Sequence, residues 1–201
     1  MKLFFLLLSL VFVISCVKLP VKYAPSSSAE YTNHPSPNQT TVIRHVYIDP
    51  SFKSVTKDEI VDGLEEWNKV LNGYDKFVVA KGEAPSYENM SPFDFLVVNI
   101  TAQEAEEMMM PDGVLGWVDE LGDPVIHLVE YRMVDEDVKT LLAHEMGHSL
   151  GLPHLPVRGT LMFPYFPNSP CIDETTVREL VTVHKGQFDL EHLNWCNFKL
   201  N

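Results

Sequence analysis

Residues 144–154 read His-Glu-Met-Gly-His-Ser-Leu-Gly-Leu-Pro-His, and the three histidines of this stretch have a spacing that suits a metal site. His144 and His148 are four residues apart, so on a helix both imidazoles project from one face. Gly151 can adopt a left-handed conformation that turns the chain, and His154 can then present a third imidazole from outside the helix. Three imidazoles leave the fourth tetrahedral position of a zinc ion open, which is typical of a catalytic zinc site.

Glu145 follows the first of these histidines but points in another direction, so it is poorly placed to be a ligand. It is well placed to hydrogen-bond a zinc-bound water, to take the proton as the water attacks a carbonyl, and to pass that proton to the leaving amine. The sequence therefore predicts one catalytic zinc ion and the hydrolysis of peptide bonds, with Glu145 as the catalytic base.

The same stretch resembles the metzincin signature HExxHxxGxxH, and every specified position of the signature is present. Residues 159–164 (Gly-Thr-Leu-Met-Phe-Pro) resemble the Met-turn of that group, in which Met162 would form an apolar floor beneath the zinc ligands. Within the metzincins, the sequences HEMGHSLGLPH and TLMFP are most similar to those of the matrixins. This resemblance covers roughly residues 41–186 and is strong over residues 144–164.

The resemblance to matrixins implies a zincin-type α+β fold. Its parts would be a twisted, five-stranded, mostly parallel sheet with an antiparallel edge strand, an active-site helix, the Met-turn and a C-terminal helix. An extended protein or peptide substrate would pair with the edge strand at Val114, Leu115 and Gly116. The wall of the pocket just past the scissile bond would include Pro164 and Tyr165.

Hydrophobic periodicity and capping signals independently predict an α+β domain with one sheet backed by helices. The expected strands cover residues 41–49, 76–80, 94–101, 113–119 and 124–131. The first expected helix runs from a capping box at Thr56 and Glu59 to Leu71, and the second runs from an acidic N-cap at residues 135–137 to Leu150. A third helix is expected over residues 174–185, and residues 102–112 are expected to form a loop or a short helix.

Residues 1–15 have the features of a signal peptide, because Lys2 precedes an apolar run that is too short to span a membrane. Cys16 then resembles the lipidated cysteine of bacterial lipoproteins, and ordinary signal cleavage nearby is the alternative. Residues 16–40 are rich in Pro and Ser and are expected to form a tether. We therefore expect an exported protein, anchored by lipid in the cell envelope or secreted, with a catalytic domain over residues 41–201.

The chain has 201 residues, of which 15 are Lys or Arg and 28 are Asp or Glu, giving a formal net charge of -13. This negative charge argues against nucleic acid and anionic lipid as partners. We therefore expect a monomer that contacts the membrane only through its lipid anchor.

Asp112, Asp119 and Asp123 could bind calcium, but they lack a spaced oxygen-ligand pattern. In an exported protein, a disulfide between Cys171 and Cys196 is favoured over free thiols.

The alternative to an endopeptidase is a zinc-binding surface protein, such as an adhesin or a binding module, that keeps the fold but has little catalytic activity. A relic of this kind would be expected to lose Glu145 or a metal ligand first. Neither is lost in this sequence, so we favour the endopeptidase.

Overall fold

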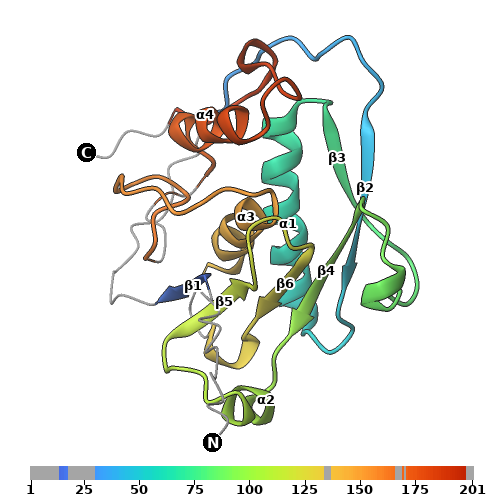
Figure 1. The fold of residues 1–201 in the computed structure, drawn as a ribbon, viewed down its shortest axis with the longest axis vertical. Coiled ribbons are helices and arrows are strands. Elements are labelled where there is room, and N and C mark those ends of the chain that lie inside the picture. Colours follow the sequence, from blue (N-terminus) through green and yellow to red (C-terminus); the bar gives the residue numbers. More distant parts are fainter. Residues whose placement is uncertain (1–13, 18–29, 134–136, 166–168, 170, 198–201) are drawn as a thin grey trace, which may run out of the picture.

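The structure is a computed structural model that describes residues 14–17, 30–133, 137–165, 169 and 171–197. Its sheet contains β2 (Val42–Ile48), β3 (Asp75–Val79), β4 (Asp94–Asn99), β5 (Val114–Val118) and β6 (Val125–Leu128). β2 pairs in parallel with β3 and β4, β4 pairs in parallel with β6, and β5 pairs antiparallel with β6 (Figure 1). This five-stranded, mostly parallel arrangement confirms the predicted fold class.

A further strand, β1 (Ile14–Val17), lies antiparallel along the outer edge of β5. The strand order is therefore β1-β5-β6-β4-β2-β3. β1 comes from the segment that we expected to lie outside the fold, and it occupies the edge that we expected to be open for substrate. In this structure these four residues therefore belong to the sheet, although we expected all of residues 1–40 to lie outside the folded domain.

Helices lie on one side of the sheet and beyond its ends, as Figure 1 shows. They are α1 (Ser54–Leu71), α2 (Ala102–Glu107), α3 (Val138–Ser149) and α4 (Glu174–Val183), and single 3-10 turns lie at Tyr87–Asn89, Glu130–Arg132 and Leu190–His192. α1 and α3 pack against each other in the main core, where Trp67 donates a hydrogen bond to the carbonyl of Ala143 (2.8 Å). Among the described residues, no helix has the length and apolar character to cross a membrane.

The start of α1 differs from the prediction. The helix begins at Ser54, with Lys53 as an N-cap whose side chain makes no capping hydrogen bond, so Thr56 lies inside the helix and is buried. The structure instead has a capping box at the start of α2, where the Thr101 side chain accepts from the Glu104 backbone and the Glu104 side chain accepts from the Thr101 backbone. The pattern at Thr56 and Glu59 therefore does not form the predicted capping box, whereas the same pattern at Thr101 and Glu104 does form one.

Residues 30–36, which we expected to belong to the tether, pack against the C-terminal segment of the domain. The backbone N–H of Thr32 donates to the carbonyl of Trp195 (2.8 Å), and the N–H of Asn197 donates to the carbonyl of Glu30 (3.0 Å). The imidazole of His34 packs edge-on against the indole of Trp195 at a centroid distance of 4.7 Å. In this structure the contacts of the domain therefore include residues 30–36, whereas we expected the tether to extend to residue 40.

Tyr31 ties this N-terminal segment to the main core. Its hydroxyl donates a hydrogen bond to the buried carboxylate of Glu66 on α1. The ammonium groups of Lys69 and Lys139 lie 2.8 Å and 3.1 Å from the same carboxylate. Burial raises the pKa of the Tyr31 hydroxyl, and the negative charge of Glu66 raises it further, so this hydroxyl stays protonated and remains a donor.

We expect Tyr31→Phe to lower the free energy of unfolding by about 1.5–3 kcal/mol, because it removes a hydrogen bond to a buried charged group. Urea unfolding at neutral pH measures the change. Ser36→Ala is the control, because Ser36 makes only an exposed side-chain hydrogen bond to Asn72, and it should change stability by less than about 0.5 kcal/mol. Equal stability of Tyr31→Phe and the unmodified protein would show that the segment is not held by this contact.

Candidate metal centre

α3 begins and ends at well-defined caps. The carboxylate of Asp137 accepts hydrogen bonds from the backbone N–H (3.0 Å) and the hydroxyl (2.6 Å) of Thr140 and so fixes the first turn. After the last helical residue, Ser149, the chain turns at Gly151, which has φ of 83°. The N–H of Gly151 bonds to the carbonyl of His148 (2.8 Å). A side chain at position 151 would be strained in this left-handed conformation, as the sequence predicted.

The turn brings His154 beside the two histidines of α3. The three residues each offer a nitrogen atom, and these atoms all lie within 4.8 Å of one another. His144 and His148 are fully buried, whereas His154 is half-buried. In the part of the chain that the structure describes, this is the one group of three or more His, Cys, Asp or Glu residues that could hold a metal ion.

Backbone carbonyls fix the orientation of both helical imidazoles. Nδ1 of His144 lies 2.6 Å from the carbonyl oxygen of Leu161, and Nδ1 of His148 lies 2.7 Å from that of Leu152. A carbonyl oxygen only accepts, so Nδ1 carries the proton in each ring and Nε2 carries the lone pair. Nε2 of His144 is buried and has no hydrogen-bond partner among the described residues. A metal ion would satisfy this lone pair, so the donor set fits zinc.

The electrostatics of the site favour neutral imidazoles. Burial lowers the pKa of His144 well below its usual value, and the neighbouring His148 lowers it further. Burial likewise lowers the pKa of His148 to about 4 and lowers the pKa of His154. All three rings are therefore neutral at pH 7, which is the form that binds a metal ion.

Glu145 is fully buried and lies beside β5. A Cβ atom built on Gly116 would be 3.3 Å from Cγ of Glu145 and 3.0 Å from Cδ2 of Leu128. The backbone of β5 therefore passes directly along the side chain of Glu145. The structure thus brings together the predicted catalytic base and the strand predicted to bind substrate, in which Val114 and Leu115 are buried.

Met162 packs against α3 at Gly147. It is fully buried, and its carbonyl accepts a hydrogen bond from the N–H of Leu155 (2.7 Å). A Cβ atom built on Gly147 would lie only 2.5 Å from Sδ of Met162. The close approach of α3 to the Met-turn therefore requires glycine at position 147, between the two helical histidines.

The other predicted site residues lie in several places. Pro164 is half-buried, and Tyr165 is 45% exposed, with its ring centroid 5.7 Å from that of Phe163. Cys171 and Cys196 form a disulfide with a Cα–Cα distance of 6.2 Å. Cys16 lies in β1, and its side chain is outside the described part of the structure. The predicted acidic cap of α3 is described only at Asp137, because residues 134–136 lie outside the described residues.

The sequence did not reveal the groups that hold the histidines. Leu152 and Leu161 act through their backbone carbonyls, which no side-chain pattern identifies. Asp173, whose carboxylate accepts a hydrogen bond from the N–H of Leu161 (2.7 Å), was also missed. The spacing of Asp173 and Thr176 could have indicated a helix N-cap, but not the contact with Leu161.

We expect Gly147→Ala to destabilise the protein by about 1–3 kcal/mol, because the new methyl group would overlap the buried side chain of Met162. Helix propensity alone predicts the opposite sign, since alanine is favoured over glycine by about 1 kcal/mol in a helix. Thermal and urea unfolding of the metal-free proteins distinguish the two effects. In Met162→Ala, the added cost of Gly147→Ala should largely disappear, and an undiminished cost would contradict the proposed overlap.

Three comparisons with known proteins are informative about this geometry. Residues 61–178, more than half of the chain, match the family model of the matrixins. A search of curated proteins gives no significant match. Among solved structures, an archaemetzincin from Methanopyrus kandleri is similar with a TM-score of 0.51 and 16% sequence identity, over 74% of this chain and 98% of that chain. This likeness supports the fold. The match over residues 61–178, which contain all three histidines, shows that the chain belongs to the matrixin family of zinc metallopeptidases.

Proposed function

We propose that this protein is an exported, lipid-anchored zinc endopeptidase that cleaves peptide bonds within proteins, with Glu145 as the general base. The observation that carries this proposal is the buried Nε2 of His144, which has no hydrogen-bond partner among the described residues, in a ring that offers a nitrogen within 4.8 Å of those of His148 and His154. Glu145, the next residue along α3, is also fully buried.

His144, His148 and His154 would hold one zinc ion through nitrogen atoms. When bound, zinc supplies Lewis acidity, which lowers the pKa of water and polarises a peptide carbonyl. The carbonyls of Leu161 and Leu152 hold the two helical rings in the required tautomer, so little reorganisation is needed when the metal binds.

Glu145 would move the proton during hydrolysis. Its carboxylate oxygens would take a proton from the attacking water and deliver it to the nitrogen of the leaving amine. The side chain has no exposed surface, and the backbone of β5 at Gly116 limits its movement. Such a buried and confined carboxylate can be held at a fixed distance from a peptide bond that lies along β5.

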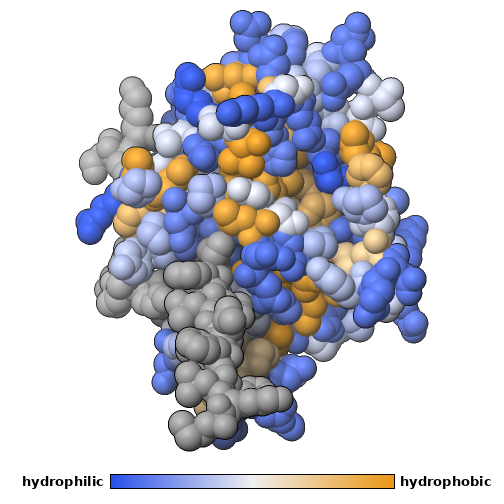
Figure 2. All heavy atoms as spheres, viewed as in Figure 1, coloured by the Kyte–Doolittle hydropathy of each residue, from blue (hydrophilic) through white to orange (hydrophobic). Residues whose placement is uncertain are grey.

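A substrate would bind in an extended conformation along β5. The outer edge of β5 already pairs antiparallel with β1, which supports the view that this edge accepts an extended peptide in that direction. Figure 2 shows exposed apolar patches between hydrophilic ones on the viewed face of the molecule. On the loop that follows His154, Val157 is 48% exposed and Tyr165 is 45% exposed. These residues support a preference for apolar side chains just past the scissile bond.

Maturation would free part of this edge. Cleavage before Cys16 would remove Ile14 and Ser15, which pair with Val118 and Trp117. The lipid on Cys16 would then anchor the protein, and β5 would be available for substrate at Trp117 and Val118, while Val17 still pairs with Val114. Export and the lipid anchor are supported by the sequence of residues 1–16.

We expect Glu145→Gln to bind about one zinc ion per chain and to cleave peptides at least about 100-fold more slowly than the unmodified protein, because it removes only the proton-accepting group. A quenched peptide library and metal analysis measure both properties, and a chelator should abolish cleavage by the unmodified protein. Cleavage by Glu145→Gln at an undiminished rate would contradict the role of Glu145. Zinc binding without cleavage by either protein would favour the alternative of a zinc-binding surface protein.

For the anchor, we expect Cys16→Ala to abolish incorporation of a labelled fatty acid and to move the protein out of the membrane fraction. Expression in a bacterium that processes lipoproteins, followed by fractionation and labelling, gives the result. An unmodified protein that carries no label, with a new N-terminus other than Cys16, would support ordinary signal cleavage instead.

A further inference from the structure

Leu161 is held at both of its backbone polar groups. Its carbonyl oxygen lies 2.6 Å from Nδ1 of His144, and its N–H donates to Oδ2 of Asp173 at 2.7 Å. The residue is 1% exposed and precedes the fully buried Met162. The backbone of Leu161 therefore links the imidazole of His144 to the carboxylate of Asp173.

The bond to Leu161 is additional to what helix capping requires. Asp173 is the N-cap of α4, where Oδ1 accepts from the backbone N–H of Thr176 (3.0 Å) and Oδ2 accepts from its hydroxyl (2.8 Å). Asp137 makes the same two bonds to Thr140 at the start of α3. These two bonds complete the N-terminal capping of α4. The bond from Leu161 therefore serves to connect α4 to the Met-turn loop.

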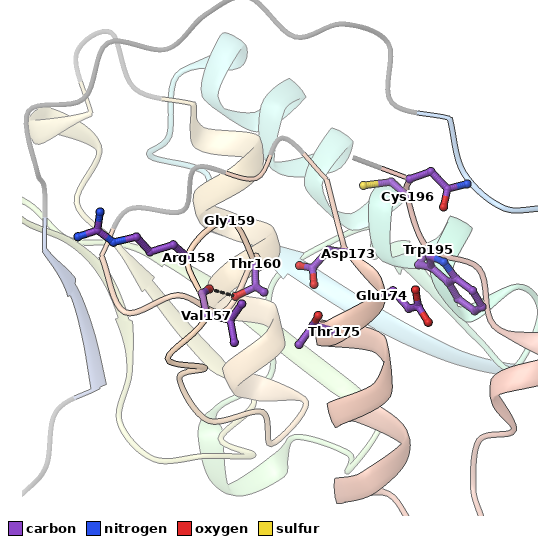
Figure 3. A pocket seen from close by; sticks show the side chains of 10 residues that line it. Val157, Arg158, Gly159, Thr160, Asp173, Glu174, Thr175, Trp195 and Cys196 are labelled. Carbon is purple, nitrogen blue, oxygen red and sulfur yellow. Dashed lines mark hydrogen bonds between the residues drawn. The ribbon is translucent and has the colours of Figure 1, made fainter. Parts of the chain in front are cut away.

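The backbone of Asp173 is held next to the disulfide between Cys171 and Cys196. It pairs with Cys196 in a parallel β-bridge, and the N–H of Cys196 donates to the carbonyl of Ile172 (2.9 Å). The disulfide joins Cys196 to Cys171, two residues before Asp173. Figure 3 shows the carboxylate of Asp173 between Thr160 of the Met-turn loop and Cys196, at the wall of a cavity of about 300 Å³.

We propose that Asp173 is a positioning residue for the metal centre: by holding the N–H of Leu161 it fixes the carbonyl that orients His144, and so strengthens the binding of zinc. Groups that orient a ligating histidine contribute substantially to metal affinity, although Asp173 is one contact further away. This inference rests on the proposed zinc site and adds a role for the start of α4, which contributes no ligand to it.

Two substitutions separate this role from helix capping. Asp173→Ser keeps a good N-cap residue but is too short to reach Leu161. Thr176→Val removes the hydroxyl bond to Asp173 and keeps the bond from Leu161. Zinc affinity is measured at neutral pH by competition with a chromogenic chelator, and urea unfolding of the metal-free proteins reports helix stability.

We expect Asp173→Ser to bind zinc about tenfold more weakly and Thr176→Val to stay within about threefold of the unmodified protein. In NMR spectra of the zinc-loaded proteins, the proton on Nδ1 of His144 should exchange faster with solvent in Asp173→Ser only. Unchanged zinc affinity in Asp173→Ser would overturn the inference, as would equal weakening by both substitutions, which would indicate a general effect of α4. If the unmodified protein bound no zinc, the proposed function would fail first.

Discussion

The metal centre depends on two hydrogen bonds from histidine rings to backbone carbonyls in a part of the core that excludes water. His144 donates to Leu161 and His148 donates to Leu152. Burial keeps these rings neutral, and the carbonyls decide which nitrogen carries the proton. Without these bonds the two helical rings could rotate or change tautomer, and the convergence of the three imidazoles would be lost.

The surrounding fold serves to keep those carbonyls and rings in place. Gly151 turns the chain so that Leu152 meets His148, and the absence of a side chain at Gly147 lets the Met-turn pack beneath α3. β5 passes along Glu145, and so places the strand that we propose to bind substrate beside the residue that we propose as the general base. A side chain is opposed at Gly147 by the close approach of Met162 and at Gly151 by the left-handed backbone, which explains why the motif combines glycines with histidines and not histidines alone.

Much of this arrangement could be predicted because the chemistry lies within one short segment. Helical spacing places His144 and His148 together, and a glycine turn adds His154, so local rules suffice. What could not be predicted depends on contacts between distant parts of the chain. The composition of residues 16–40 indicates a tether, yet a single hydrogen bond from Tyr31 to Glu66, 35 residues away, helps to fix its last part to the domain. The strand β1, which pairs with β5 about 100 residues along the chain, was missed for the same reason.

The most direct test of the account is a zinc-edge anomalous diffraction measurement on crystals of the zinc-loaded protein. We predict one strong peak within coordination distance of nitrogen atoms from His144, His148 and His154, with Nδ1 of the two helical rings still bonded to their carbonyls. The absence of a peak there, or a peak held by other residues, would contradict the central claim that these three histidines form the metal centre.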